Sequence, residues 1–331
     1  MEINYGSPFS GERLEKLKSF LTKQGLDYDE QQQFSLCIMD GPKIIATGAL
    51  DVNVLKCIAV DPAHRNEGLA ARIVTELINK AAEQGQYHLF IFTGPENKEL
   101  FSGLGFYSIA QTKKALLMEN KKDGIIDFVS GLQKPDGGKI GAIVANCNPF
   151  TKGHLYLIEK AARECDILHL FILSENKSFF SSDLRKELAV NGTAHIPNVI
   201  VQPTGPYIIS AATFPKYFIK DDAPGGVNAE LDLKIFAEHI ARPLGISRRY
   251  VGTEPNCRLT ASYNRKMKET LPQYGIEVVE VPRLEIQSSD HSKAISASSV
   301  RNFLLEGAMA EIEALVPPAT YRYLLEYGKH S

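Results

Sequence analysis

The chain has 331 residues, of which 44% are hydrophobic and 23% charged, and its formal net charge at pH 7 is −2. One hydrophobic core rarely grows past about 250–300 residues, so we expect two domains. Without a long basic block the chain is not expected to bind nucleic acid, and without about 18 successive apolar residues it is not expected to span a membrane.

We expect a cytoplasmic protein. The residues after Met1 show no basic stretch followed by an apolar one, which a signal peptide would have. The five cysteines form no C-x-x-C pair, which indicates buried thiols in a reducing compartment rather than disulfides or a metal site.

The first part of the chain predicts a mixed α/β unit. Asp40-Gly41 between two apolar runs is a hairpin signal. Leu69, Ile73 and Leu77 recur every four residues, as on the buried face of a helix. We expect helices over 11–24, 68–83 and 96–104, and strands over 34–39, 43–50, 55–60 and 89–93.

The second part alternates apolar strands with helices, which is typical of a parallel sheet covered on both faces. Ligands bind such sheets at the carboxyl ends of the strands. We expect strands over 140–145, 166–173, 198–202, 249–251 and 276–281, and helices after the first strand, over 182–190 and over 297–306.

A stretch rich in Pro, Gly and charge near 133–139 indicates a link between the two parts. The fold class predicted is therefore α/β, with a smaller mixed α/β domain over 1–120, a linker over 121–138 and a parallel-sheet domain over 139–331.

The segment Thr151-Lys152-Gly153-His154 follows the first strand of the second domain and opens a helix. Backbone N–H groups at a helix N-terminus favour an anion, and Gly153 lets a phosphate approach the backbone. His154 can donate a hydrogen bond to a phosphoryl oxygen. The alternative is a plain helix start with an exposed histidine.

Three serines, Ser296, Ser298 and Ser299, cluster at another helix start, with Arg301 one turn inside. Hydroxyls, N–H groups and a guanidinium together suit a polyphosphate. The alternative is a serine-capped surface helix, which accounts for one serine but not for the set.

Together, T-x-G-H after a strand and I-S-x-[ST]-x-x-R before a late helix resemble the two signatures of the nucleotidyltransferase superfamily. The resemblance covers about 139–325. It implies a Rossmann-like domain that transfers a nucleotidyl group from a nucleoside triphosphate and releases pyrophosphate. It also implies that Mg²⁺ accompanies ATP through phosphate oxygens and water.

The resemblance implies a role for each matching residue. Catalysis falls to Thr151, Lys152 and His154, with Thr151 and His154 at the α-phosphate and His154 stabilising the transition state. The β- and γ-phosphates fall to the serine cluster and Arg301, and Gly252-Thr253-Glu254 would lie near the adenosine. The full set of implied ATP-binding residues is Asn148, Phe150, Gly153, Gly252, Thr253, Glu254, Ile295, Ser296, Ser298, Ser299 and Arg301.

In the first domain, Arg65, Gly68 and Ala70 match the R-x-x-G-x-[GA] signature of the GNAT acetyltransferases, and Gly105-Phe106-Tyr107 resembles a later element of that family. The resemblance covers about 3–118 and implies that Arg65, Gly68 and Ala70 bind CoA or another pantetheine group. The alternative is a loop that caps an amphipathic helix. No residue identifies itself as a general base, and Tyr107 is a candidate general acid.

The two domains in this order resemble the citrate lyase ligase family over nearly the whole chain. The resemblance implies that ATP and acetate form acetyl-adenylate and pyrophosphate. The prosthetic-group thiol of the citrate lyase acyl carrier subunit then takes the acetyl group and releases AMP. The acceptor thiol belongs to the carrier, so Cys147 is assigned to the strand end and not to catalysis.

Two further features stay open. The irregular segment 204–228, with Tyr207, Ser210, Thr213, Tyr217 and Lys220, is either a wall near the acetate or thiol arm or a surface loop. Arg185 either meets a substrate anion or is solvated. The competing functions are a coenzyme-forming adenylyltransferase acting on phosphopantetheine or a mononucleotide, a GNAT-type N-acetyltransferase, and a non-enzymatic sensor of ATP or acetyl-CoA.

Overall fold

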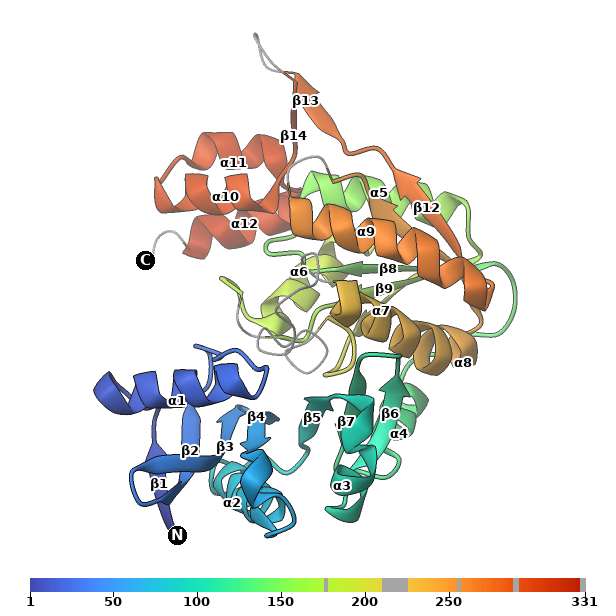
Figure 1. Cartoon of the computed structure of the whole chain (residues 1–331). Coiled ribbons are helices and arrows are strands. Elements are labelled where there is room, and N and C mark those ends of the chain that lie inside the picture. Colours follow the sequence, from blue (N-terminus) through green and yellow to red (C-terminus); the bar gives the residue numbers. More distant parts are fainter. Residues whose placement is uncertain (176–177, 210–225, 255–256, 288–291, 328–331) are drawn as a thin grey trace. The chain divides into compact units, whose positions relative to one another are not determined.

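The computed structural model of the chain describes residues 1–175, 178–209, 226–254, 257–287 and 292–327 (Figure 1). They form two compact units. The first comprises the described residues of Met1–Ile125 and Ala211–Asp232, and the second those of Ile126–Ser210 and Leu233–Ser331. Helix α4 (Gly124–Ser130) lies within the stretch expected as a linker, and the boundaries at 120 and 139 stay a prediction.

The first unit is built on a seven-stranded sheet in the order β1-β2-β3-β4-β5-β7-β6, in which only β4 and β5 run parallel. Its strands are β1 (Glu2–Gly6), β2 (Phe34–Asp40), β3 (Lys43–Asp51), β4 (Val54–Val60), β5 (Phe90–Thr93), β6 (Tyr107–Gln111) and β7 (Leu116–Glu119). Its helices are α1 (Gly11–Lys23), α2 (Leu69–Glu83) and α3 (Lys98–Gly103), with short 3₁₀ helices at Pro62–His64 and Pro95–Asn97.

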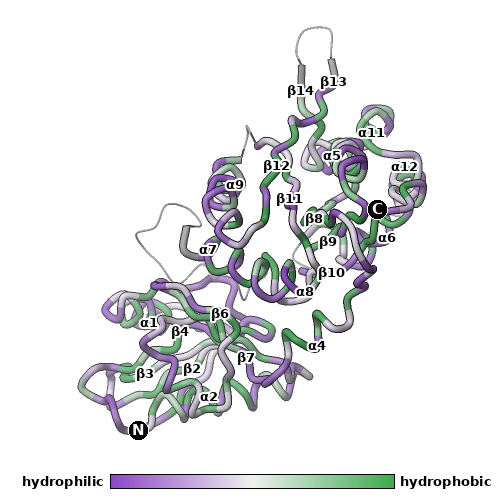
Figure 2. The backbone as a smooth tube through the Cα atoms, turned by 90° about the vertical axis from the view of Figure 1, so that its right-hand side faces the viewer, coloured by the Kyte–Doolittle hydropathy of each residue, from purple (hydrophilic) through white to green (hydrophobic). Residues whose placement is uncertain are grey.

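Helix α2 packs on the sheet through the apolar stripe that the sequence predicts, and its hydropathy can be followed in Figure 2. Leu69, Ile73 and Leu77 are all buried. A Cβ at Gly48 of β3 would lie 2.4 Å from Ile73 Cγ2, so only glycine permits this close approach of helix and strand. The stripe and this glycine hold α2 closely against β3.

The second unit is built on a five-stranded parallel sheet in the order β10-β9-β8-β11-β12. Its strands are β8 (Ile140–Ala145), β9 (Ile167–Ile172), β10 (Val199–Pro203), β11 (Ile246–Gly252) and β12 (Glu277–Val281). Its helices are α5 (Lys152–Arg163), α6 (Ser182–Thr193), α8 (Arg242–Leu244) and α9 (Arg258–Thr270), with a 3₁₀ helix at Leu271–Tyr274. Helix α7 (Gly226–Ile235) leads into a π-helical turn at Phe236–Ala241 that precedes α8.

Both faces of the parallel sheet are covered, as its continuous apolar strands predict. Neighbouring residues of β8 enter opposite cores, Ala142 with the π-helical turn, α8 and α9, and Ile143 with α5 and α6. The first strand, β8, has β9 on one side and β11 on the other. The chain direction across the sheet therefore reverses between β8 and β11, where sheets of this kind bind their ligands.

The end of the chain adds a two-stranded hairpin, β13 (Glu285–Gln287) with β14 (Ser292–Ala294), and three helices. Helices α10 (Ala297–Leu305), α11 (Met309–Leu315) and α12 (Pro318–Tyr327) pack together around Val300, Ile312 and Leu324 (Figure 1). This packing fixes the start of α10, which carries the serine cluster.

No helix in the described residues is long and apolar enough to cross a membrane. Nowhere in the same residues do three or more His, Cys, Asp or Glu side chains gather as a metal site would require.

Candidate active site

Thr151 and His154 cap helix α5 reciprocally. The Thr151 hydroxyl accepts the His154 backbone N–H at 3.3 Å, and the ring Nδ1 of His154 accepts the Thr151 backbone N–H at 3.1 Å. Because Nδ1 is an acceptor in this cap, the proton of the neutral ring lies on Nε2. The cap therefore leaves His154 with one N–H donor that the helix does not use.

His154 is uncharged at neutral pH. Burial lowers the pKa of His154 to about 4, and the positive charge of Arg283 acts in the same direction. The side chain is a hydrogen-bond donor without a positive charge, so any cation at this place must come from another residue.

Arg301 joins the two motifs. Its guanidinium donates to the backbone carbonyl of Asn148 and, at 3.1 Å, to the hydroxyl of Ser298. A Cβ on Gly153 would lie 3.4 Å from the backbone oxygen of Ile295, so the first turn of α5 lies directly against the approach to α10. Segments about 140 residues apart therefore form one wall.

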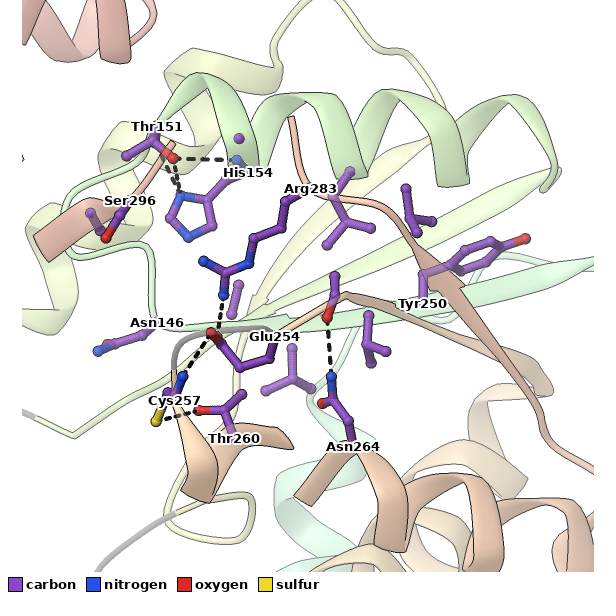
Figure 3. Close-up of a pocket in the computed structure, with 18 of the residues that line it drawn as sticks. Asn146, Thr151, His154, Tyr250, Glu254, Cys257, Thr260, Asn264, Arg283 and Ser296 are labelled. Atoms are coloured by element: carbon purple, nitrogen blue, oxygen red, sulfur yellow. Dashed lines mark hydrogen bonds and ion pairs between the residues drawn. The ribbon is translucent and has the colours of Figure 1, made fainter. Parts of the chain in front are cut away.

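A cavity of about 490 Å³ opens at the carboxyl ends of β8, β11 and β12, at the reversal point of the sheet (Figure 3). Eight of the residues predicted from sequence line it. They are Thr151, Gly153, His154, Gly252, Glu254, Ile295, Ser296 and Ser298. The structure thus brings both motifs and the end of β11 to one cavity.

The other predicted residues of this domain do not line the cavity. Lys152 points away, with its ammonium donating to the Glu313 carbonyl at 3.1 Å. The Asn148 side chain accepts the Phe180 N–H at 3.1 Å, and Phe150 is fully buried beside the His154 ring. The residues outside the lining are Asn148, Phe150, Lys152, Thr253, Ser299 and Arg301. Their assigned roles stay predictions.

Arg185 was interpreted from the sequence as contacting a substrate anion or as solvated, and the structure supports neither interpretation. Its side chain is 0% exposed, so it is not solvated. It donates to the backbone carbonyls of Asn146, Phe180 and Glu175, and it does not line the cavity. Arg185 holds the loop after β8 in place, because buried carbonyls without partners would be costly.

Arg283 follows β12 and lines the cavity, and it was not predicted from the sequence. Its backbone N–H and its Nε donate to the hydroxyl and carbonyl of Thr253, and its Nη2 pairs with the carboxylate of Glu254. Figure 3 shows the guanidinium between His154 and Glu254. A cation directly after a parallel strand was the signal that could have revealed it.

One cysteine departs from the expectation that all five are buried. Cys37, Cys57, Cys147 and Cys165 are buried, but Cys257 is exposed and lines the cavity. A hydrogen bond from the Thr260 hydroxyl lowers the pKa of the Cys257 thiol. The cavity that the two motifs share therefore contains an exposed thiol with a lowered pKa.

The first unit has its own cavity, of about 820 Å³, lined by Arg65, Gly68 and Ala70. It lies where β4 and β5, paired at Val54–Phe90 and Leu55–Ile91, stop pairing. Gly68 caps α2 with a φ of 71°, a left-handed conformation that favours glycine. Tyr107, the candidate general acid, is exposed and does not line this cavity.

The irregular segment 204–228 falls largely outside the described residues, which include 204–209 and 226–228. Tyr207 is buried with its ring 5.3 Å from that of Phe128, and Ile209 lines the cavity of the second unit. Ser210, Thr213, Tyr217 and Lys220 lie outside the description, so the role of this segment stays a prediction.

Comparisons with known proteins agree with this geometry. A family model of the citrate lyase ligase C-terminal domain matches residues 140–324, and one of the acetyltransferase (GNAT) family matches residues 7–106. The chain is 41% identical to a citrate (pro-3S)-lyase ligase of Klebsiella pneumoniae over 325 residues, which cover 96% of this chain and 94% of that protein. This chain belongs to the citrate lyase ligase family.

A citrate (pro-3S)-lyase ligase of Escherichia coli (strain K12) is 40% identical over 328 residues, or 96% of this chain and 92% of that protein. A solved structure of a putative nicotinate-nucleotide adenylyltransferase from Vibrio parahaemolyticus matches 58% of this chain and 94% of that one, with 19% identity and a TM-score of 0.37.

Membership of the citrate lyase ligase family identifies the protein as an enzyme, a ligase. The predicted fold class, a parallel-sheet nucleotidyltransferase-like domain after a GNAT-like domain, is confirmed.

His154 should stay neutral well below pH 6. We expect ¹⁵N NMR of histidine-labelled protein to show the Nε2–H form of His154 from pH 8 down to about 5, with the peak assigned by its loss in His154→Asn. The unfolded chain takes up this proton near pH 6.5. His154 therefore makes the fold less stable as the pH falls from about 6.5 toward 4, and a titration midpoint near 6.5 in the folded protein would contradict the cap geometry.

The alkylation rate of Cys257 should depend on whether ATP occupies the cavity. Iodoacetamide at neutral pH should alkylate Cys257 before the other four thiols, since burial raises their pKa values, to about 11 for Cys37 and to about 12 for Cys57 and Cys147. ATP should slow the alkylation, as followed by mass spectrometry. Equal rates with and without ATP would place the nucleotide elsewhere.

Proposed function

We propose that the protein uses ATP to activate acetate as acetyl-adenylate, with release of pyrophosphate. The acetyl group then passes to the prosthetic-group thiol of the citrate lyase acyl carrier subunit, with release of AMP. The observation that carries the proposal is the meeting of both phosphate motifs over one cavity, with the Nε2–H donor of His154 left over by the helix cap.

Acetate is a poor acyl donor, and adenylylation gives it a good leaving group. One carboxylate oxygen forms a bond to the α-phosphorus while the bond to pyrophosphate breaks. The N–H groups at the start of α5 and the His154 Nε2–H would stabilise the growing negative charge. Ser296 and Ser298 at the start of α10 offer hydroxyl groups for the outer phosphates.

Mg²⁺ would reach the site with ATP, held by phosphate oxygens and water, because ATP-bound Mg²⁺ keeps most of its own ligands. The thiol needed for acyl transfer belongs to the carrier subunit. We also propose a cytoplasmic location for the protein, and this location rests on the sequence alone.

The first unit would receive the pantetheine arm of the carrier. Its cavity has Arg65, Gly68 and Ala70 at the start of α2, where successive N–H groups can hold a pyrophosphate. The exposed position of Tyr107 away from this cavity gives no support to acetyl transfer to an amine. We therefore assign this unit to binding and the second unit to chemistry.

The adenylylation step is tested by exchange of labelled pyrophosphate into ATP. We expect exchange that depends on acetate and does not need phosphopantetheine. Exchange that requires phosphopantetheine or a mononucleotide and ignores acetate would instead identify a coenzyme-forming adenylyltransferase, and turnover of acetyl-CoA with an amine but without ATP would identify an N-acetyltransferase.

Two substitutions separate the cap from the chemistry of His154. In His154→Asn the amide can replace Nδ1 in the cap but offers no donor at the Nε2 position, so exchange should fall about 10²- to 10³-fold while ATP affinity changes little. His154→Gln places an amide near Nε2 and should retain more exchange. The exposed His195 provides the control His195→Asn, and wild-type exchange in His154→Asn would overturn the assignment.

A substitution of Arg65 tests whether the first unit binds the pantetheine arm while the second unit carries out the chemistry. Arg65→Glu should slow acetylation of the carrier subunit about tenfold or more by repelling its phosphates, and should leave acetate-dependent exchange unchanged. Arg72→Glu, on the exposed side of α2 and outside the cavity, is the matched control. Loss of both activities, or of neither, would argue against a separate pantetheine site in the first unit.

A further inference from the structure

The guanidinium of Arg283 is fixed beside the imidazole of His154. Its Nε donates to the Thr253 carbonyl at 2.7 Å and its Nη2 pairs with Glu254, whose side chain is only 7% exposed. Glu254 is itself held by the backbone N–H of Cys257 at 3.1 Å. Two contacts just after β11, with Thr253 and Glu254, therefore set the direction of the Arg283 side chain, and Cys257 holds Glu254 in place (Figure 3).

One edge of this guanidinium remains available to a ligand. The Nη1 group, with two N–H donors, makes no hydrogen bond to any residue that the structure describes. The side chain is 29% exposed and lines the cavity. A planar donor group held rigidly in this way suits a planar carboxylate, because little side-chain freedom is lost on binding.

Among the described residues that line this cavity, Arg283 is also the accessible positive charge. His154 is neutral, and neither Lys152 nor Arg301 is in the lining, since Lys152 donates to the Glu313 carbonyl and Arg301 donates to the Asn148 carbonyl and the Ser298 hydroxyl. In the described lining the second cation is Arg249, which is 2% exposed and lies over the Phe236 ring at 4.3 Å. Two anions must meet in adenylylation, so a cation at their meeting point lowers their repulsion.

We propose that Arg283 binds the carboxylate of the acid substrate and directs it at the α-phosphate beside His154. This inference rests on the proposed adenylylation of a carboxylic acid. One carboxylate oxygen stays on Nη1 while the other forms the bond to phosphorus, the bond to pyrophosphate breaks, and no proton is transferred.

The neighbours of Arg283 indicate the class of acid. The Glu254 carboxylate on the far side of the guanidinium would repel a second negative charge. Leu284, Val251 and Ile295 give the cavity an apolar lining. The site therefore fits a short monocarboxylic acid and rejects a dicarboxylic acid of similar length.

The test uses Arg283→Gln and Arg283→Lys in the full chain, with acetate-dependent pyrophosphate exchange as the readout. For Arg283→Gln we expect the KM for acetate to rise about 10- to 100-fold, the loss expected for a charge-assisted hydrogen bond, and the KM for ATP to stay within about twofold. Arg283→Lys keeps a cation and should restore part of the acetate affinity. Arg248→Gln removes an arginine that pairs with Glu277 outside the cavity and should change neither KM.

An unchanged KM for acetate in Arg283→Gln would overturn the inference while the proposed function stands. A rise in the KM for ATP alone would also overturn it, since Arg283 would then belong to the nucleotide site. Wild-type exchange that ignores acetate would overturn the proposed function and the inference with it. If Arg283→Gln fails to fold, the Lys variant decides, because a purely structural role would not raise the acetate KM selectively.

A second measurement requires no turnover. Wild-type protein loaded with α,β-methylene-ATP should bind acetate more tightly than succinate, as measured by calorimetry. Loaded Arg283→Lys should bind acetate at least about fivefold more weakly while keeping its affinity for the analogue. Equal acetate affinity in the two proteins, or tighter binding of succinate by the wild type, would contradict the assignment.

Discussion

The active site depends on the reciprocal cap between Thr151 and His154. Any helix start leaves backbone N–H groups without partners, and here the imidazole satisfies one of them. This use of Nδ1 fixes the ring tautomer and leaves Nε2–H as the unused donor, and desolvation of the ring lowers its pKa and keeps it neutral. The cap that helix α5 needs at its start thereby provides an oriented donor, the His154 Nε2–H, at the place where negative charge on the phosphate would develop.

Two arginines stabilise the backbone around this cap. Arg185 does so in place of the roles considered for it from the sequence, and the phosphate-binding role of Arg301 stays a prediction. Arg185 gathers backbone carbonyls of the loop after β8, and Arg301 ties that loop to the start of α10. The positive charge that we propose for the reaction point belongs to Arg283, which is fixed by Thr253 and Glu254. On this proposal, the cations that stabilise the backbone and the cation that binds the carboxylate substrate are different residues.

Much of the fold follows from local patterns in the sequence. The apolar stripe of α2 and the continuous strands of the parallel sheet were predicted because periodicity and burial are directly linked. The strands β1, β6 and β7 and the hairpin of β13 and β14 were not predicted, although β5, β10 and β12, which are as short as the first three, were. The turn of Lys152 toward Glu313 and the burial of Arg185 depend on tertiary neighbours far apart in sequence, which no local pattern encodes.

The central claim is that acetate attacks the α-phosphate of ATP within the second unit. The most direct measurement follows oxygen from acetate labelled with ¹⁸O on both carboxylate positions during acetylation of the carrier subunit. Attack on the α-phosphate requires that one ¹⁸O atom leaves with AMP, and the account predicts AMP that carries a single label. Unlabelled AMP, or label found in orthophosphate or pyrophosphate, would contradict it.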